Sequence, residues 1–386
     1  MSRKIPVAST DLGGNEERYV VDAIRSSWIS STGPYLNRFE REYAALCGTS
    51  SAVAVCNGTV ALHLALLALD VRPGDEVLVP SLTYVATANA VRYVGAEPVF
   101  VDVDRDTWCI DPAQLEASIT RRTRGVIAVH LLGHPADMDR INHIAAVNGL
   151  WVVEDAAEAP LATYKGRIVG QLARMATFSF FGNKLLTCGE GGAVTVNDAQ
   201  LDTRLRILRG QGMDPQRRYY FPVTGYNFRL TNVAAAILCA QLERKDEILA
   251  RRRAIFERYR ELLSPIRGIG FQPTAEWASI SPWMFAATVD AEEFGCTRDE
   301  LAAALAEQEI ETRPLFYPLH KLPPFREESQ QRGERLPVTD ELAASAIMLP
   351  TYNLLTDVDL VRITGVIADV RKARRKRPAP PNAAAA

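Results

Sequence analysis

Lys184 lies between an aromatic run and a glycine-rich turn. Phe180 and Phe181 precede it closely, and no carboxylate follows it before Glu190. Most lysines lie on solvated faces, but an amine among apolar neighbours loses solvation, and this favours its neutral form. A neutral amine can form a Schiff base with an aldehyde, so this stretch predicts a nucleophilic lysine. The spacing alone leaves a second interpretation open, in which Lys184 is a surface lysine that follows a strand.

Two carboxylates close an apolar strand at Glu154 and Asp155. Polar groups at the carboxyl ends of parallel strands mark the place where a ligand site is expected. A carboxylate there could hold a metal ion, a ribose hydroxyl or a cationic ring nitrogen. Strand ends also often carry an aspartate that caps the next helix, so this feature alone decides nothing.

Residues 57–59, with the sequence Asn-Gly-Thr, join a strand to an apolar helix. Small residues let the backbone approach an anion, and the first amides of the helix supply donors and a positive dipole. An anion site is therefore one interpretation of this segment, and a plain helix cap is the other.

Other site types find no support in the sequence. It contains neither the phosphate-loop pattern GxxxxGK[ST] nor the zinc pattern HExxH, and no two of its six cysteines form a CxxC pair. His130 and His134 flank a strand end and a glycine, which indicates structural or substrate-facing residues rather than a metal pair. We therefore expect no metal site.

Short apolar runs alternate with helical patterns over the first two thirds of the chain. Continuous apolar strands separated by helices predict an α/β fold with a mostly parallel sheet covered on both faces. The predicted strands span residues 52–55, 76–80, 98–103, 125–130 and 150–155, with a hairpin arm at 193–196 and helices at 60–69 and 86–94.

The pattern changes near residue 233. A long helix over 233–263, continuous or broken, precedes a smaller α+β region, with a strand at 284–289, a helix at 298–309, a turn at 314–324 and a helix at 357–370. We therefore predict a large domain over residues 1–245, a small C-terminal domain over 246–370, and a basic, disordered tail over 371–386.

Composition excludes several classes of protein. Of 386 residues, 47% are hydrophobic and 23% are charged, as in an ordinary soluble globule. No apolar run reaches the roughly 18 residues of a membrane helix, and the first residues show no apolar signal region, so we expect a cytoplasmic protein.

The formal net charge of −2 is unevenly distributed. Six of the 44 basic residues lie within 371–377, so 38 basic and 46 acidic residues remain elsewhere, a net charge of −8. An acidic body is unlike a nucleic-acid-binding surface. A DNA-binding regulator is the alternative of another class, but it requires a helix-turn-helix with a basic recognition face, and the sequence outside the tail shows none.

Taken in order, the motifs resemble the DegT-type family of pyridoxal-phosphate (PLP) nucleotide-sugar aminotransferases. The resemblance extends from about residue 5 to 370, and it implies the fold-type-I PLP transferase architecture. The matching segments are residues 28–34, 57–59, 80–90, 154–159, 179–184, 189–192, 209–212 and 225–231.

The resemblance also implies roles for individual residues. Lys184 matches the Schiff-base lysine, and Asp155 matches the carboxylate that keeps the pyridine nitrogen protonated. Asn227 matches a residue that a neighbouring subunit lends to the phosphate, which implies a homodimer or a higher oligomer. The other implied cofactor contacts are Tyr84 (stacked on the ring), Gly58, Thr59 and Ser179 (phosphate) and Glu158 (near the ring hydroxyl).

The implied reaction has two halves. Glutamate loads the cofactor as pyridoxamine phosphate, and the amine then passes to a ketone on a nucleotide-linked deoxysugar in glycan or antibiotic sugar biosynthesis. GDP-4-keto-6-deoxymannose, converted to GDP-perosamine, is the first candidate substrate; another keto sugar or a keto-cyclitol is the alternative. Sugar dehydratases of the same fold carry histidine at the lysine position, so Lys184 favours transfer. Tyr317 and His320 are candidate sugar contacts, unless they only pack in the turn that contains them.

Overall fold

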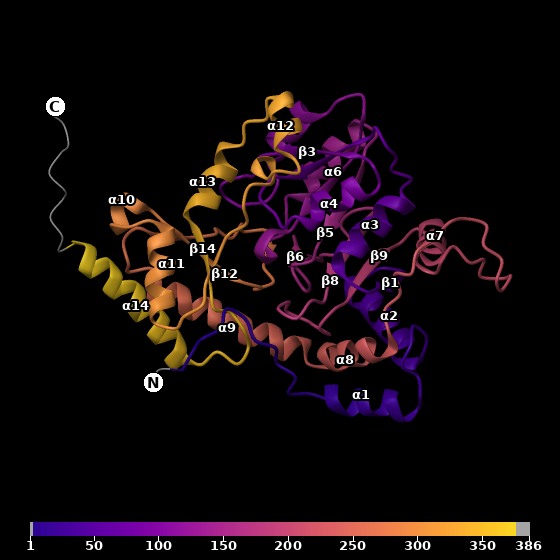
Figure 1. Ribbon diagram of the computed structural model, residues 1–386, viewed down its shortest axis with the longest axis horizontal. Helices are drawn as coiled ribbons and strands as arrows, with labels where there is room; N and C mark the ends of the chain where they lie inside the picture. Colours follow the sequence, from indigo (N-terminus) through magenta and orange to yellow (C-terminus); the bar gives the residue numbers. More distant parts are fainter. Residues whose placement is uncertain (1–2, 376–386) are drawn as a thin grey trace.

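The computed structural model describes residues 3–375, and a seven-stranded sheet forms its centre (Figure 1). The strand order is β1-β9-β8-β5-β4-β2-β3, in which β8, β5, β4, β2 and β3 are mutually parallel, whereas β9 runs antiparallel to both β8 and β1. The predicted α/β class, mostly parallel sheet and hairpin arm are therefore confirmed. The strands are β1 (Ser51–Val55), β2 (Glu76–Pro80), β3 (Glu97–Val101), β4 (Thr123–Val129), β5 (Trp151–Asp155), β8 (Met175–Ser179) and β9 (Gly192–Val196).

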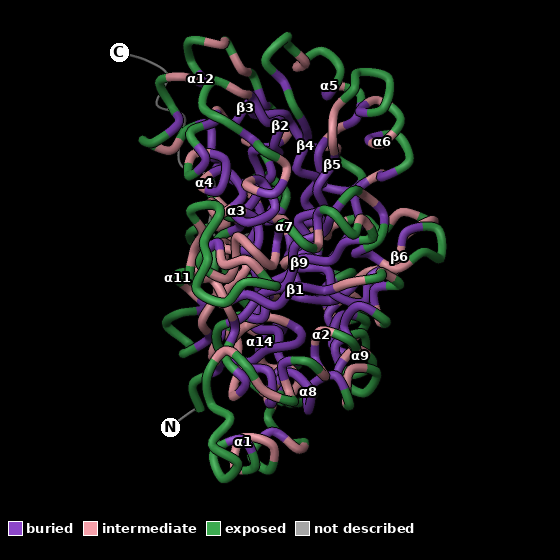
Figure 2. The backbone as a smooth tube through the Cα atoms, turned by 90° about the vertical axis from the view of Figure 1, so that its right-hand side faces the viewer, coloured by how far each residue is buried: buried purple, intermediate pink, exposed green. Residues whose placement is uncertain are grey.

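Both faces of this sheet are apolar because successive side chains of a strand point to opposite sides. In β4, Val126 and Ala128 pack in one core, and Ile127 packs in another. Figure 2 shows the strands of this sheet as a buried band, with most of the exposed backbone at the periphery. Helices on one face are α2 (Pro34–Cys47), α6 (Met138–Val147) and α8 (Asn232–Glu243), and those on the other are α3 (Gly58–Ala68), α4 (Ala86–Tyr93) and α7 (Ala199–Arg209).

A second, antiparallel sheet of order β10-β12-β14-β13 forms the core of the smaller α+β region. Phe285 of this sheet packs with Leu301 and Ile363 of the flanking helices. Its strands are β10 (Ile269–Phe271), β12 (Phe285–Val289), β13 (Arg313–Pro314) and β14 (Ala346–Leu349), with helices α9 (Lys245–Leu263), α10 (Ala291–Phe294), α11 (Arg298–Glu307) and α14 (Asp357–Arg375).

The long helix expected from residue 233 is broken at Arg244, which separates α8 from α9. Some residues after 245 pack against the central sheet rather than against the second sheet. Leu319 and Phe325 pack against Phe100 of the central sheet, next to α12 (Arg326–Arg332) and α13 (Pro337–Ser345). The division into domains at residue 245 therefore stays a prediction.

The predicted disordered tail begins too early. Helix α14 continues through Arg375 rather than ending at residue 370, so residues 371–375 are helical. Lys372 pairs with Asp369, and Arg374 pairs with Glu300 of α11. Cations in the last turn also favour the helix dipole, which explains why basic residues extend the helix. The remainder of the predicted tail, residues 376–386, lies outside the described residues.

Within residues 3–375, no helix is long and apolar enough to span a membrane.

The remaining elements lie at the periphery. Residues 210–230, here called the arm, connect α7 to α8 and extend outward at the right of Figure 1. The other elements are α1 (Glu16–Arg25), α5 (Pro112–Leu115) and a three-stranded sheet of β6 (Thr163–Tyr164), β7 (Arg167–Ile168) and β11 (Ala278–Ser279).

Candidate active site

Lys184 lies in the tight loop that joins β8 to β9. The loop is closed by backbone hydrogen bonds from Lys184 N to Phe181 O (2.9 Å) and from Cys188 N to Phe180 O (3.0 Å). The Lys184 amine lies over the ring of Trp283, 3.9 Å from its centroid. Burial lowers the pKa of Lys184, while Glu158 and Asp155 oppose this shift through their charge. The structure therefore favours the interpretation of Lys184 as a desolvated amine over that of a surface lysine.

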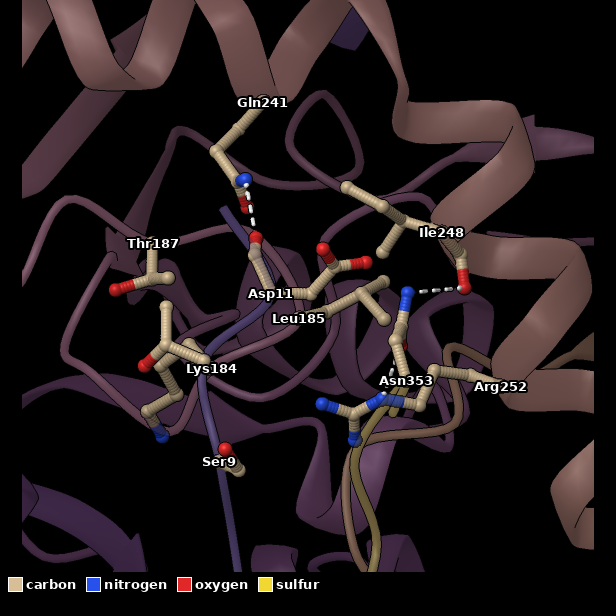
Figure 3. A pocket seen from close by; sticks show the side chains of 10 residues that line it. Ser9, Asp11, Lys184, Leu185, Thr187, Gln241, Ile248, Arg252 and Asn353 are labelled. Carbon is tan, nitrogen blue, oxygen red and sulfur yellow. Dashed lines mark hydrogen bonds between the residues drawn. The ribbon is translucent and has the colours of Figure 1, made fainter. Parts of the chain in front are cut away.

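Trp283 is the neighbour of Lys184 that sequence reasoning missed. It is buried, its Nε1–H donates to Asn183 O (3.0 Å), and its own carbonyl accepts from Nη1 of Arg252 (2.6 Å). Arg252 also donates through Nε to Oδ1 of Asn353 (2.7 Å), and burial lowers the pKa of Arg252 to about 10. Figure 3 shows Lys184 and Arg252 on either side of a cavity of about 10 Å³, which has room for about one water molecule.

Asp155 is the carboxylate of β5 that faces the site. Its Oδ2 accepts from the hydroxyl of Thr87 (2.7 Å), and its Oδ1 accepts from the backbone N–H of Ala157 (3.2 Å). Burial raises the pKa of Asp155, whereas these two hydrogen bonds and the charge of Lys184 lower it. A buried carboxylate with two oriented donors can accept a further N–H from a cationic ring.

Glu154 faces the opposite side of the same strand, and the structure assigns it a packing role. Its carboxylate accepts backbone N–H groups from Gly170 (3.1 Å) and Leu172 (2.8 Å) and lies 3.0 Å from Nε2 of His130. Alternation along the strand separates the two adjacent carboxylates. The strand pattern alone made either carboxylate a candidate ligand group. The alternation of side chains along β5 turns Asp155, and not Glu154, toward the site.

Glu158 follows β5 and is buried. Its Oε2 accepts from the backbone N–H of Leu132 (2.7 Å), a residue in the left-handed region with φ of 56°. Burial raises the pKa of Glu158 to about 7, while the charge of Lys184 and the Leu132 hydrogen bond act in the opposite direction. At neutral pH this carboxyl can therefore hold or release a proton beside Lys184.

The N-terminus of α3, here called the cradle, has the features of an anion site. Asn57 caps the helix, since its Oδ1 accepts from Val60 N (2.9 Å), and the first amides of a helix have no acceptor within it. A Cβ placed on Gly58 would lie 2.7 Å from Cβ of Ser179, so only glycine leaves room there. Two neighbouring segments thus bring small residues to one place, as the anion interpretation requires. These residues are Gly58, Thr59 and Ser179.

The two histidines near β4 have structural roles. Nδ1 of His130 accepts from Ala136 N (3.0 Å), which together with the Glu154 contact occupies both ring nitrogens. His134 contacts Pro135 O through Nδ1, and its Nε2 accepts from Ala275 N (3.1 Å). Burial lowers the pKa of His134 to about 4, so the ring is neutral. Within residues 3–375, no three His, Cys, Asp or Glu side chains are placed to hold a metal ion.

Three other expected site residues have different surroundings. Tyr84 follows β2; the residue is 58% exposed, and its ring centroid lies 6.0 Å from that of Phe316. Tyr317 is also exposed. His320 is buried, with Nδ1 2.8 Å from the hydroxyl of Ser81 and Nε2 3.5 Å from Asp340. The roles of Tyr317 and His320 as sugar contacts stay predictions.

Asn227 lies at the base of the arm and is exposed. The backbone next to it contacts the chain just before the phosphate cradle, because Cys56 N donates to Phe228 O (2.9 Å). Its predicted role in a neighbouring subunit's site concerns an oligomer and stays a prediction.

Comparison with known proteins identifies the chain. The model of the DegT/DnrJ/EryC1/StrS aminotransferase family matches residues 10–368. The chain belongs to this family. GDP-perosamine synthase from Caulobacter vibrioides is 45% identical over 95% of this chain and 98% of its own length, and that from Escherichia coli O157:H7 is 42% identical over 93% and 96%. The crystal structure of DesI in the presence of its TDP-sugar product aligns with a TM-score of 0.90 and 32% identity, over 97% of this chain and 95% of that one.

Members of this family are PLP-dependent aminotransferases, so the predicted family, enzyme class and cofactor are confirmed. The residues present fit this cofactor. The cradle at α3 suits its phosphate, Asp155 suits its ring nitrogen, and Lys184 has an amine that would bind its aldehyde carbon.

Proposed function

We propose that the protein moves the amino group of glutamate to a keto group of a nucleotide-linked deoxysugar. GDP-4-keto-6-deoxymannose is the first candidate substrate, with GDP-perosamine as product. Two relatives of 45% and 42% identity that carry the name GDP-perosamine synthase support this choice. The observation on which the proposal depends most is the Lys184 amine, held 3.9 Å from the ring centroid of Trp283, where the charges of the buried carboxylates Asp155 and Glu158 act on it.

Each of these side chains has a defined task. When bound, the cofactor supplies an aldehyde that takes up the amino group and a ring that accepts negative charge. Asp155 would hold a proton on the ring nitrogen through its carboxylate, which Thr87 orients. Lys184 would hold or move a proton at the substrate carbon through Nζ. The residues that would bind the phosphate are Gly58, Thr59 and Ser179.

The arm supports the proposal of a homodimer or a higher oligomer. It exposes a group of large apolar side chains, and contiguous exposed apolar surface marks interaction sites. We propose that a second copy covers the arm and that Asn227 serves the cradle of the neighbouring subunit. The exposed side chains of the arm are Tyr219, Tyr220, Phe221 and Val223.

The test is a mass-spectrometric assay of the PLP-loaded protein with glutamate and a panel of nucleotide-linked keto sugars. Glutamate should yield 2-oxoglutarate, and one sugar, GDP-4-keto-6-deoxymannose first, should gain an amine. Lys184→Ala should abolish turnover while remaining folded. Turnover of none of the keto sugars by the wild-type protein would refute the proposal. Aspartate or glutamine as a better donor would refute only the glutamate assignment.

A further inference from the structure

His63 lies on α3, about one turn after the cradle, among three aromatic rings. Its ring centroid lies 5.5 Å from that of Tyr93 on α4, 5.4 Å from that of Tyr226 and 5.6 Å from that of Phe228. Among residues 3–375, no group forms a hydrogen bond with its buried Nε2. The ring is therefore held by its aromatic neighbours, and burial lowers the pKa of His63, so that it packs as a neutral group at neutral pH.

Two of these rings belong to the base of the arm, and they flank Asn227. Tyr226 and Phe228 stack on each other, with their centroids 4.7 Å apart and their planes inclined by 18°. Successive side chains of an extended segment point to opposite sides. A contact that holds Tyr226 and Phe228 on one side therefore also sets the direction of the exposed Asn227 between them.

The same helix meets the arm and forms the cradle. Its side chain at His63 contacts the two rings, and the chain just before it contacts the backbone of the arm, because Cys56 N donates to Phe228 O (2.9 Å). Helix α3 thus supplies the cradle of its own chain and, through His63, the packing surface for the segment that carries Asn227.

We propose that His63 is a positioning residue that holds the base of the arm so that Asn227 reaches the cradle of the neighbouring subunit. This inference rests on the proposed oligomer with a shared site. His63 acts through Tyr226 and Phe228 and does not itself touch the cofactor. Its effect is therefore expected in the site of the partner subunit rather than in the site of its own chain.

Titration of the cofactor-free protein with PLP tests the inference. His63→Leu keeps apolar bulk but removes the ring, and the loss of its aromatic contacts should raise the Kd for PLP about tenfold. His63→Phe keeps a ring and should stay within about threefold of wild type. Leu67→Ala is the matched control, because Leu67 is also half-buried and lies one turn later on the same face of α3, where it packs against the core beside α4.

Mixed dimers test whether the effect crosses the subunit interface. With Lys184→Ala in one chain, only the other protomer can form the Schiff base with PLP, so its absorbance reports the Kd of that one site. His63→Leu placed on the Lys184→Ala chain should weaken the remaining site about tenfold. His63→Leu placed on the chain that keeps Lys184 should leave the remaining site as it is in the mixed dimer without this substitution.

The opposite pattern, with weakening only when His63→Leu and Lys184 share a chain, would overturn the inference, since His63 would then support only its own helix. An equal rise in Kd for Leu67→Ala would also overturn it. Asn227→Ala separates this inference from the shared site. If Asn227→Ala binds PLP as tightly as wild type, the shared site fails and this inference fails with it. If Asn227→Ala weakens binding and His63→Leu does not, only this inference fails. None of these titrations requires a sugar, so the proposed substrate is tested separately.

Discussion

The amine of Lys184 lies against the face of Trp283, 3.9 Å from the ring centroid. A cation over an indole face is attracted by the ring quadrupole. The same indole is fixed at Nε1 by the backbone of Asn183, and Arg252 holds its carbonyl. The fixed indole therefore gives the Lys184 amine a defined position when the amine is not bonded to the cofactor.

Replacing Trp283 should change the protonation of Lys184. Trp283→Leu removes the ring face that stabilises the ammonium and should lower the pKa of Lys184 further by about 1, because the contact contributes about 1–2 kcal/mol. Trp283→Phe keeps a ring face and should lie closer to wild type. The measurement is an NMR titration of the ¹³C-methylated amine in cofactor-free protein. An equal pKa in wild type and Trp283→Leu would contradict the assignment.

Asp155→Asn should leave the fold intact and impair the chemistry. The asparagine carbonyl can still accept from Thr87, but the amide cannot hold a proton on the ring nitrogen by charge. Removal of such an oriented electrostatic group costs about 10²–10³ in kcat. Stopped-flow absorbance of the glutamate half-reaction measures this rate, and circular dichroism controls for folding. A kcat within threefold of wild type would exclude the role of Asp155.

Glu158 should make the stability of the cofactor-free protein depend on pH. Its pKa rises from 4.5 to about 7 on folding, so the buried neutral carboxyl stabilises the fold fully below pH 4.5 and loses this contribution as pH rises through 7. Relative to Glu158→Gln, whose amide does not titrate, the wild type should lose roughly 3 kcal/mol between pH 4.5 and 8. Urea unfolding of both proteins across this range measures the difference, and a constant difference would contradict the prediction.

Gly58→Ala should weaken cofactor binding. The added Cβ would lie 2.7 Å from Cβ of Ser179, within the phosphate cradle, and such overpacking costs about 1–3 kcal/mol, or roughly tenfold or more in the Kd for PLP. Gly365→Ala in α14 is the control, since its Cβ meets nothing within 4 Å. Absorbance titration with PLP measures both, and equal Kd values would show that Gly58 does not border the phosphate.

The local order of the sequence determined most of the large sheet and part of the site. Apolar runs of the right length predicted β1 to β5 within a few residues, because a strand buried on both faces must be continuously apolar. Local patterns left Lys184 and the segment at Gly58 each with two interpretations, and the resemblance to the DegT-type family selected the functional one. The structure adds neighbours that are distant in the sequence, Trp283 at Lys184 and Ser179 at Gly58.

Tertiary structure decided what contiguous residues could not. The strand pattern by itself did not distinguish Glu154 from Asp155, although the family resemblance named Asp155. The position of β5 between its neighbours explains that choice, because it places Asp155 toward Thr87. Likewise, Trp283 carries no local sign of function. It reaches the Lys184 loop because the second sheet packs against the first, and that packing is set by buried side chains from the whole chain rather than by any one segment.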